Sequence, residues 1–497
     1  MRRPDHRACR TAVRASAVTA ALWLAVAVSA CGDEAVSSDA APAPGSTLRA
    51  TLVDRDGDGF LERGPAAPLL DRTELGGGRK PGRVLARFGQ LTDTQVRDEE
   101  SPARVPFLDR VGPPFTSTFR PQEAESAQVL DATVRALNRQ CPQAVVVTGD
   151  IVDNAQANEL DAALAVLRGG RVNPDTGAAG YDGVQRAGNP DPYYYRPEHD
   201  APRHPGLEAA AQRPFTAAGL RAPWYPALGN HDVLVQGEVP TTPAIEAVAA
   251  GDELVTELDP RLRPPTDEVS APAAVSALLS GSDGLPGRSE RVAADPGRRT
   301  LDAAAVVERL RAAAAPRAGT VAGRLDYAFD IGARVRAIVL DTVRREGGSR
   351  GLVVPEQEAW LQRQLARAGE RRVIVFSHNP LDASDGGERA LSAMAASGKV
   401  VAAVAGNRHR NTIEPYGAGG FWLIGTSSLA DFPQQGRMFK LSEASGGGVV
   451  LETWMVDHDG RGVAGPAREL AYLDAQGGRP QGFAGRPADR NARLYVP

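Results

Sequence analysis

The sequence predicts an α/β layered fold, and two features of the chain support this prediction. Apolar runs of strand length recur along the sequence, and each ends abruptly in a polar motif; they cover residues 83–91, 144–147, 223–228, 372–376 and 400–404. Amphipathic stretches alternate with these runs, at about residues 121–139, 155–168, 355–369 and 386–396. Such alternation is typical of a sheet that helices cover and that is buried, at least in part, on both faces.

Two further regions indicate a second sheet. Residues 327–341 contain two strand-like runs, and residues 419–456 contain several more with few helical signals. The chain has 497 residues, of which 42% are hydrophobic and 24% charged, so it can bury a large core. This length allows two or three domains, or one catalytic domain with insertions.

The charge of the chain bears on its partners. The formal net charge is -4 at pH 7. Binding nucleic acid without regard to sequence needs a positive field that neutralises phosphates, and the chain as a whole has none. Nucleic acid is therefore not the expected partner.

The N-terminal residues predict export. Five arginines within the first fourteen residues precede an apolar stretch at 15–30, which is too short and too polar at its edges for a membrane span. We predict a signal peptide over residues 1–30. Its end, Val28-Ser29-Ala30-Cys31, resembles the lipobox of bacterial lipoproteins, in which the cysteine is lipidated and becomes the mature N-terminus. The alternative is an ordinary signal peptide that carries Cys31 by chance.

The lipobox resemblance implies a cell-surface lipoprotein, anchored through Cys31 to the outer face of the cytoplasmic membrane. Residues 31–47 lack periodicity and are rich in Ala, Ser, Pro and Asp, so we expect a flexible tether there. Removal of the signal peptide takes Cys9 and lipidation consumes Cys31, which leaves Cys141 without a disulfide partner. We then expect Cys141 to be a small, buried hydrophobic residue.

The segment Asp54-Arg-Asp56-Gly-Asp58-Gly59 matches the first half of an EF-hand calcium loop. A glutamate should close such a loop at its twelfth position, but Pro65 stands there. We therefore predict a tight turn between two strands.

Polar motifs that carry chemistry follow the five apolar runs in a fixed order. They are Asp93-x-Gln95, Gly149-Asp150-x-x-Asp153-Asn154, Gly229-Asn230-His231-Asp232, His378 and Gly406-Asn407-x-His409. Each motif alone is weak, since a Gly-Asp pair ends many strands and a lone histidine is commonly structural. Polar residues at the carboxyl ends of strands are, however, where α/β proteins place their sites.

The ordered set resembles the calcineurin-like metallophosphoesterase family, whose pattern is DxH, GDxxD, GNH(E/D), a lone His and GHxH. The tetrapeptide GNHD is its most specific piece here. The resemblance implies a four-layer α-β-β-α sandwich of two mixed sheets with long insertions, and it looks closest to an exported actinobacterial branch. It implies a metallophosphoesterase domain over residues 83–457 with inserts at 169–222 and 236–323. We expect an N-terminal extension at 48–82 and an irregular C-terminal tail at 458–497.

The family's chemistry explains these residue types. Hydrolysis of a phosphate ester at neutral pH needs a hydroxide and stabilisation of charge on the phosphoryl oxygens, and two divalent or trivalent ions provide both. Carboxylates suit bridging of two cations, and imidazoles complete sites for Mn, Fe or Zn. The resemblance thus implies attack by a metal-bound hydroxide at a binuclear site.

The metal ligands carry over position by position. The resemblance implies that Asp93 and His409 bind the first metal, that Asp150 bridges both metals, and that Asn230 and His378 bind the second.

Two catalytic roles carry over as well. His231 would protonate or stabilise the leaving-group oxygen. Asp232 would orient His231.

Two positions depart from the family pattern. Gln95 and Asn407 stand where the family has histidines, so each metal loses one imidazole, although a side-chain carbonyl oxygen can still bind the ion. Asp153 is a further candidate ligand of the first metal, because some relatives with an altered first motif take a ligand from this position. In the alternative, Asp153 caps the helix that follows.

The sequence thus predicts a metal-dependent hydrolase of phosphate esters. One alternative, favoured by Gln95 and Asn407, is a metallophosphoesterase fold that has lost turnover and serves as a surface binding or scaffold protein. A third option is an exported nuclease, for which the arginine-rich inserts would have to supply a basic groove.

Overall fold

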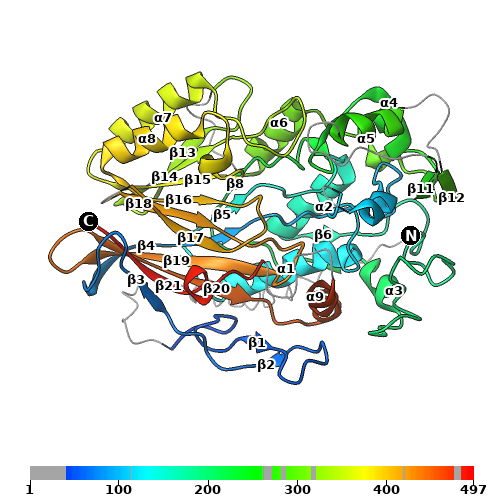
Figure 1. Cartoon of the computed structure of the whole chain (residues 1–497), viewed down its shortest axis with the longest axis horizontal. Helices are drawn as coiled ribbons and strands as arrows, with labels where there is room; N and C mark the ends of the chain where they lie inside the picture. The colour runs from blue at the N-terminus through cyan, green and yellow to red at the C-terminus, as the bar shows by residue number, and fades with distance from the viewer. Residues whose placement is uncertain are drawn as a thin grey trace, which may run out of the picture. The chain divides into compact units, whose positions relative to one another are not determined.

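Two mixed β-sheets pack face to face in the computed structural model of this protein (Figure 1). The structure describes residues 41–112, 115–259, 261, 271–280, 287–314, 321–417, 420–474 and 483–497. The predicted signal peptide and Cys31 lie outside these residues. Among the described helices, none is both long and apolar enough to cross a membrane.

The larger sheet has seven strands among the described residues. In spatial order they are β3 (Leu70–Arg72), β21 (Ala492–Val496), β20 (Val449–Asp457), β19 (Gln435–Ala444), β4 (Pro81–Leu91), β5 (Ala144–Thr148) and β8 (Trp224–Ala227). Strands β4, β5 and β8 are parallel, with Phe88 opposite Ala144 and Val147 opposite Pro226. Their carboxyl ends therefore meet at one edge of the sheet.

The second sheet has six strands among the described residues. They are β13 (Tyr327–Ile331), β14 (Val335–Leu340), β15 (Arg372–Ser377), β16 (Val400–Ala405), β18 (Phe421–Gly425) and β17 (Thr412–Tyr416) in spatial order. Strands β14, β15, β16 and β18 are parallel. Every residue of β16 is buried, as expected for a strand whose side chains are all small or β-branched and packed on both faces.

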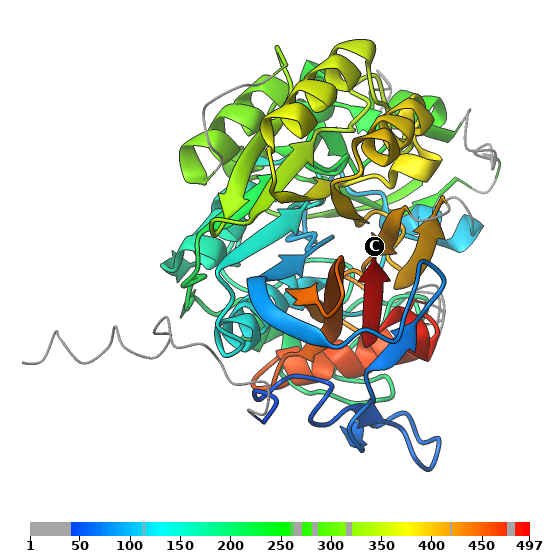
Figure 2. The same cartoon turned by 90° about the vertical axis from the view of Figure 1, so that its left-hand side faces the viewer.

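Helices cover the outer face of each sheet, so the predicted four-layer α-β-β-α sandwich is confirmed (Figures 1 and 2). Helices α7 (Pro355–Arg367) and α8 (Gly387–Ser397) pack on the six-stranded sheet, and α1 (Ser126–Asn138) packs on the seven-stranded sheet beside α2 (Ala157–Arg168) and α9 (Ala464–Leu473). Between the sheets, Phe88 of β4 meets Phe376 of β15 edge to face, with ring centroids 5.9 Å apart.

The five predicted apolar runs are the strands β4, β5, β8, β15 and β16, and the four amphipathic stretches are α1, α2, α7 and α8. Local signals set the helix ends. Proline occupies the first position of α7, where its missing N–H costs no hydrogen bond. Helix α8 ends at Ser397, and the residue that follows, Gly398, has a left-handed φ of 63°.

The structure differs from the predictions for the C-terminal tail and the N-terminal tether. Residues 458–497 were expected to be irregular, but they contain α9 and β21, and β21 lies between β20 and β3 inside the larger sheet (Figure 2). The alternating apolar residues of β21 bury one face against the core, which explains why this short segment is a strand. The end of the predicted tether is also packed, because Thr47 is buried and its Oγ1 donates to the carbonyl oxygen of Met455 at 3.0 Å.

The two inserts are folded where the structure describes them. The first contains β6 (Arg171–Val172), α3 (Leu207–Ala211) and β7 (Phe215–Thr216). The second contains β10 (Val239–Pro240), α4 (Pro243–Ala249), β11 (Glu253–Leu258), α5 (Ala271–Ser280), β12 (Gly287–Arg291) and α6 (Ala303–Ala313). Residues of the second insert form a separate hydrophobic cluster with the segment that follows the first motif, including Val105 and Phe115.

Two smaller predictions have opposite outcomes. The segment from Asp54 to Gly59 is a turn between the antiparallel strands β1 (Leu52–Val53) and β2 (Glu62–Arg63), as predicted. Cys141, by contrast, is disulfide-bonded, which contradicts the prediction that it has no partner. That prediction assumed a chain from which Cys9 is removed and in which lipidation consumes Cys31; both of these cysteines lie outside the described residues.

Candidate metal centre

The five motifs meet at one place because both sheets present the carboxyl ends of their parallel strands there. Asp93 follows β4, Asp150 follows β5 and Asn230 follows β8 in the larger sheet. His378 follows β15 and His409 lies shortly after β16 in the other sheet. The candidate metal centre therefore lies where the carboxyl ends of these strands, from both sheets, come together.

The backbone at these strand ends is strained and tightly packed. Asp93, Asp150 and His409 adopt left-handed φ angles of 49°, 49° and 53°, which are uncommon for residues other than glycine. Gly229 is required by a close approach, since a Cβ atom on it would lie 2.1 Å from the backbone nitrogen of Asp150. These loops thus hold the carboxylates in defined positions.

One group of donor atoms lies around Asp93. Side-chain ligand atoms of Asp93, Asp150 and His409 all lie within 4.8 Å of one another. His409 places Nε2 at 3.3 Å from Oδ1 of Asp93. This group matches the residues that the sequence assigned to the first metal.

A second group of donor atoms shares Asp150. Nε2 of His378 lies 3.1 Å from Oδ2 of Asp150 and 3.0 Å from Oδ1 of Asn230. The amide nitrogen of Asn230 donates to the carbonyl oxygen of Gly237 at 3.0 Å, which turns its oxygen towards His378. Asp150, Asn230 and His378 therefore converge as the sequence expected of the second metal site.

Contacts behind the two histidines orient their rings. Nδ1 of His378 lies 2.8 Å from the carbonyl oxygen of Thr148, so Nδ1 carries the proton and Nε2 faces the centre. Nδ1 of His409 contacts the buried carboxylate of Asp431. Arg120 holds Asp431 in turn, with Nε donating at 2.6 Å and Nη2 at 3.2 Å.

Sequence reasoning did not identify Asp431 or Arg120. A weak signal for Asp431 exists, because it lies six residues after the strand-like run 421–425, in the segment that begins with the polar residues 426–428. Arg120 lies outside any such run.

The charges at the centre shift the pKa values of its residues. Burial alone would raise the pKa of Asp150, but the neighbouring His378 and His231 outweigh this effect and lower it to about 2. Burial would lower the pKa values of His378 and His409, but Asp150 and Asp93 respectively raise them to about 10 and about 9. The carboxylates of Asp150 and Asp93 thus stabilise positive charge at the centre.

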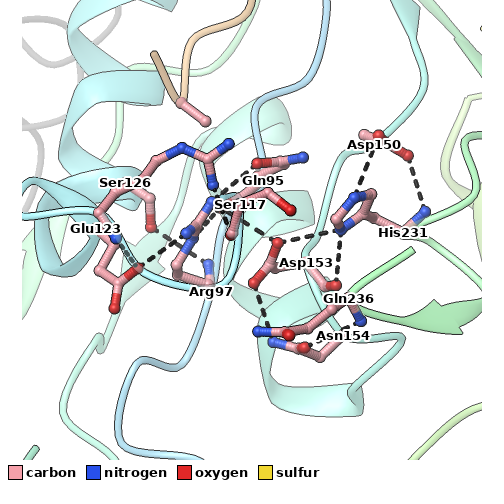
Figure 3. Close-up of polar contacts among 12 residues, drawn as sticks. Gln95, Arg97, Ser117, Glu123, Ser126, Asp150, Asp153, Asn154, His231 and Gln236 are labelled. Atoms are coloured by element: carbon pink, nitrogen blue, oxygen red, sulfur yellow. Dashed lines mark hydrogen bonds and ion pairs between the residues drawn. The ribbon is translucent and has the colours of Figure 1, made fainter. Parts of the chain in front are cut away.

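The carboxylate that contacts His231 belongs to Asp153 and not to Asp232. Nδ1 of His231 lies 3.1 Å from Oδ1 of Asp153 and 3.0 Å from its carbonyl oxygen (Figure 3). Asp153 also faces two buried guanidinium groups, at 3.7 Å from Arg97 and 3.5 Å from Arg104. Helix α2 has Gln156 at its N-cap, so Asp153 does not cap it either.

Asp232 has a structural role instead, which corrects the expectation that it orients His231. Its Oδ1 accepts from the backbone N–H groups of Ile151 at 2.7 Å and Val152 at 3.1 Å, and its Oδ2 accepts from Gly229 at 2.8 Å. Burial and the nearby Asp150 raise its pKa to about 7. Asp232 therefore ties the loop after β5 to the loop after β8.

The two residues that replace family histidines are placed differently. Oε1 of Gln95 accepts from Nη2 of Arg97 at 2.9 Å, so this oxygen points away from the donor groups. The backbone N–H of Asn407 donates to Oδ1 and Oδ2 of Asp93 at 3.1 and 3.2 Å. Both residues line the cavity described next.

A cavity of about 570 Å³ lies over the centre. Asp150, Asn230, His231 and His409 form part of its wall. Other parts of the wall come from outside the motifs; they include Val105, Phe115, Val239, Val275, Arg350 and Phe483. The second insert thus helps to enclose the space above the centre.

The donor set fits two cations that share Asp150. The atoms that converge are carboxylate oxygens, an amide oxygen and imidazole Nε2 atoms, which suit Mn, Fe or Zn better than softer metals. Both histidines have their Nδ1 atoms held by oxygen acceptors, as metal-binding histidines do.

Comparison with known proteins gives weak similarities. No protein-family model matches the chain, and no curated protein is similar to it in sequence. The chain is similar in structure to a dimetal phosphatase from Danio rerio (14% identity, 76% of this chain and 100% of that chain, TM-score 0.37). It is also similar in structure to PhoD (11% identity, 76% of this chain and 72% of that chain, TM-score 0.32). A further similar structure is the purple acid phosphatase PPD1 from yellow lupin, Lupinus luteus (12% identity, 80% of this chain and 53% of that chain, TM-score 0.29). The functional assignment therefore depends on the geometry of the centre.

Proposed function

We propose that this protein is a metal-dependent hydrolase of phosphate esters that uses two metal ions. The observation that carries the proposal is the arrangement around Asp150, where His378 and Asn230 converge on one side and Asp93 and His409 on the other. The side chain of His231 lies beside this arrangement and lines the same cavity.

Asp93, Asp150 and His409 would hold one ion, and Asp150, Asn230 and His378 the other, with the backbone N–H of Asn407 on Asp93. When bound, the two ions would stabilise charge on the phosphoryl oxygens and activate a water molecule as the nucleophile. The protein positions these ligands through the strained loops and the Arg120–Asp431 pair, so little rearrangement is needed during the reaction.

His231 is suited to donate a proton to the leaving-group oxygen. Burial would lower its pKa, but Asp150 and Asp153 outweigh that effect and raise it, which favours the protonated form of the ring. The contacts of Nδ1 with Asp153 leave Nε2 on the side of Asp150, at 4.0 Å from its Oδ2. A proton held on Nε2 is thus available beside the substrate.

A direct test compares the wild type with Asp150→Asn on a phosphate monoester and a phosphate diester, each with added Mn²⁺. We expect hydrolysis by the wild type, its loss on chelation, and a decrease of at least about a hundredfold in kcat for the variant. Asp330→Asn is the control, because Asp330 is an exposed carboxylate that pairs with Arg336 and Arg371. A wild type that binds no metal and cleaves neither ester would contradict the proposal and favour a surface scaffold.

A nuclease is the other hydrolase that this test can reveal. Three arginines line the cavity, namely the buried Arg120 and the exposed Arg350 and Arg408, and each already pairs with an aspartate. Cleavage of single-stranded DNA with binding that weakens steeply as salt rises would favour the nuclease over a hydrolase of small esters.

We also propose that the protein is exported and anchored to the membrane through Cys31. The arginines before residue 15, the apolar stretch at 15–30 and the lipobox-like end at Cys31 support this proposal. Mass spectrometry of the mature N-terminus tests the anchor: diacylglycerol on Cys31 is expected. An unmodified Cys31 joined to Cys141 would contradict the lipid anchor while leaving export intact.

A further inference from the structure

The side-chain amide of Gln95 has a fixed orientation. Its Oε1 accepts from Nη2 of Arg97 at 2.9 Å, and Nε of Arg97 donates to the backbone oxygen of Gln95 at 3.2 Å. A guanidinium group has donors and no acceptor, so the amide atom that faces it must be the oxygen. The usual ambiguity between the oxygen and the nitrogen of a glutamine is thereby removed.

Arg97 itself is held in place. Its side chain is 1% exposed, and its Nη1 donates to Oε2 of Glu123 at 3.1 Å. Glu123 in turn accepts from Arg104 at 2.5 and 2.8 Å. The side-chain oxygen of Gln95 is therefore part of a rigid, buried network of hydrogen bonds.

The amide nitrogen of Gln95 has no hydrogen-bond partner among the described residues. Gln95 is 1% exposed and lines the cavity together with Asp150 and His231. Its backbone N–H donates to the carbonyl oxygen of Asp150 at 2.9 Å, which keeps it next to the centre. In Figure 3 the amide nitrogen points away from Arg97. A buried donor left unpaired is unfavourable, so its placement indicates an acceptor that binds from outside the chain.

We propose that the amide nitrogen of Gln95 donates a hydrogen bond to an anionic oxygen of the substrate's phosphoryl group, and that Gln95 is not a ligand of the first metal. This inference rests on the proposed function, because it concerns how the same substrate is held. An amide N–H cannot bind a cation, whereas it suits an oxyanion. The positive charge of Arg97 on the amide oxygen polarises the group and strengthens its N–H as a donor.

The assignment changes the expected ligand set. The sequence placed Gln95 where the family has a metal-binding histidine, and its carbonyl oxygen was the atom expected to replace the imidazole. Since Arg97 occupies that oxygen, Asp93, Asp150 and His409 remain for the first ion. A cationic network beside the phosphoryl group takes the place of the missing imidazole.

The test measures metal binding and phosphate binding separately in Gln95→Met, which removes the donor and keeps the shape of the side chain. Calorimetry with Mn²⁺ alone should give the wild-type stoichiometry and a Kd within about threefold. Inorganic phosphate should then bind the Mn²⁺-loaded variant about tenfold or more weakly than the Mn²⁺-loaded wild type.

Gln364→Met is the matched control. Gln364 is 4% exposed, and its Oε1 accepts from Nη2 of Arg336 at 3.0 Å, so it loses the same kind of contact on helix α7, outside the cavity wall. It should bind phosphate like the wild type. Gln95→Glu is a second variant that keeps an acceptor for Arg97 and replaces the donor with an oxygen. Gln95→Glu should weaken phosphate binding at least as much as Gln95→Met does.

Two results would overturn the inference. One is the loss of an equivalent of Mn²⁺, or a tenfold weaker Mn²⁺ affinity, in Gln95→Met, which would make Gln95 a ligand. The other is unchanged phosphate affinity in both Gln95 variants while the wild type hydrolyses esters, and this result leaves the proposed function standing. A wild type that binds neither Mn²⁺ nor phosphate contradicts both.

Discussion

Nδ1 of His231 lies 3.1 Å from Oδ1 of Asp153, and this contact joins the loop after β5 to the loop after β8 at the wall of the cavity. Asp153 is fully buried, and the positive charges of Arg97, His231 and Arg104 lower its pKa against the effect of burial. The side chain of Asp153 therefore stays ionised and stabilises the charged form of His231, and the backbone carbonyl oxygen of Asp153, 3.0 Å from Nδ1, helps to orient the ring.

Substitution of Asp153 should impair proton donation by His231 without removing the metals. For Asp153→Asn we expect kcat to fall by about 10²-fold on an alkyl phosphate, whose leaving group needs a proton. The decrease should be much smaller on p-nitrophenyl phosphate, whose leaving group is stable as an anion. Equal losses on both substrates would show that Asp153 acts in another way. The control is Asp326→Asn, because Asp326 is a buried carboxylate that Gln357 holds and that does not line the cavity.

Asp431 should control metal affinity through His409. Asp431→Asn removes the charge that holds Nδ1 of His409, so we expect Mn²⁺ to bind about 10- to 100-fold more weakly in calorimetry. Asp341→Asn is matched to it, since Asp341 is a buried carboxylate that Arg345 holds through both oxygens. This control should lose stability and keep the affinity for Mn²⁺; the same loss of affinity in both variants would exclude a specific role for Asp431.

Gly229 should be essential for the position of Asp150. In Gly229→Ala the new Cβ atom would lie 2.1 Å from the backbone nitrogen and from Oδ1 of Asp150, so the loop must move. We expect a loss of about 1–3 kcal/mol in unfolding free energy, together with loss of bound metal. Gly188→Ala should leave both unchanged, because nothing lies within 4 Å of its Cβ position. Full metal content in Gly229→Ala would show that the loop tolerates the shift.

The buried carboxyl group of Glu125 should make stability depend on pH. It is fully buried without a hydrogen-bond partner among the described residues, and burial together with nearby Glu99 raises its pKa to about 8. The folded state therefore holds a proton that the unfolded state releases above about pH 4.3, so this group lowers stability progressively as pH rises from there to about 8.

Replacement of Glu125 by a residue that does not titrate should change how the unfolding free energy depends on pH. Glu125→Gln should raise the unfolding free energy relative to the wild type by at least about 1 kcal/mol more at pH 8 than at pH 5. Urea unfolding at the two pH values measures this difference. The same increment at both pH values would mean that Glu125 does not titrate in this range.

The strands and helices that build the centre were predictable because their patterns are local. Strand β5 is apolar from Ala144 to Val147 and ends before Gly149-Asp150, and α7 has its proline at the first turn. The short strand β21 was missed, since its five residues lie within a segment rich in Gly, Arg and Pro. The distribution of the five motif strands between two sheets was also not readable from any local pattern.

The ligand candidates were predictable for the same reason, but their partners were not. Asp232 adjoins His231 in sequence and was expected to orient it, whereas Asp153 is 78 residues away and does so. The role of Gln95 depends on where Arg97 points, and the contact of His409 with Asp431 depends on how β18 packs beside β16. Such contacts are products of tertiary packing.

The central claim is that Asp150 is shared by two cation sites, and metal content per chain tests it most directly. Elemental analysis after dialysis should give about two Mn²⁺ ions per chain for the wild type. His378→Ala and His409→Ala should each retain about one ion, and Asp150→Asn should retain none. Two ions in Asp150→Asn, or no metal in the wild type, would contradict the account.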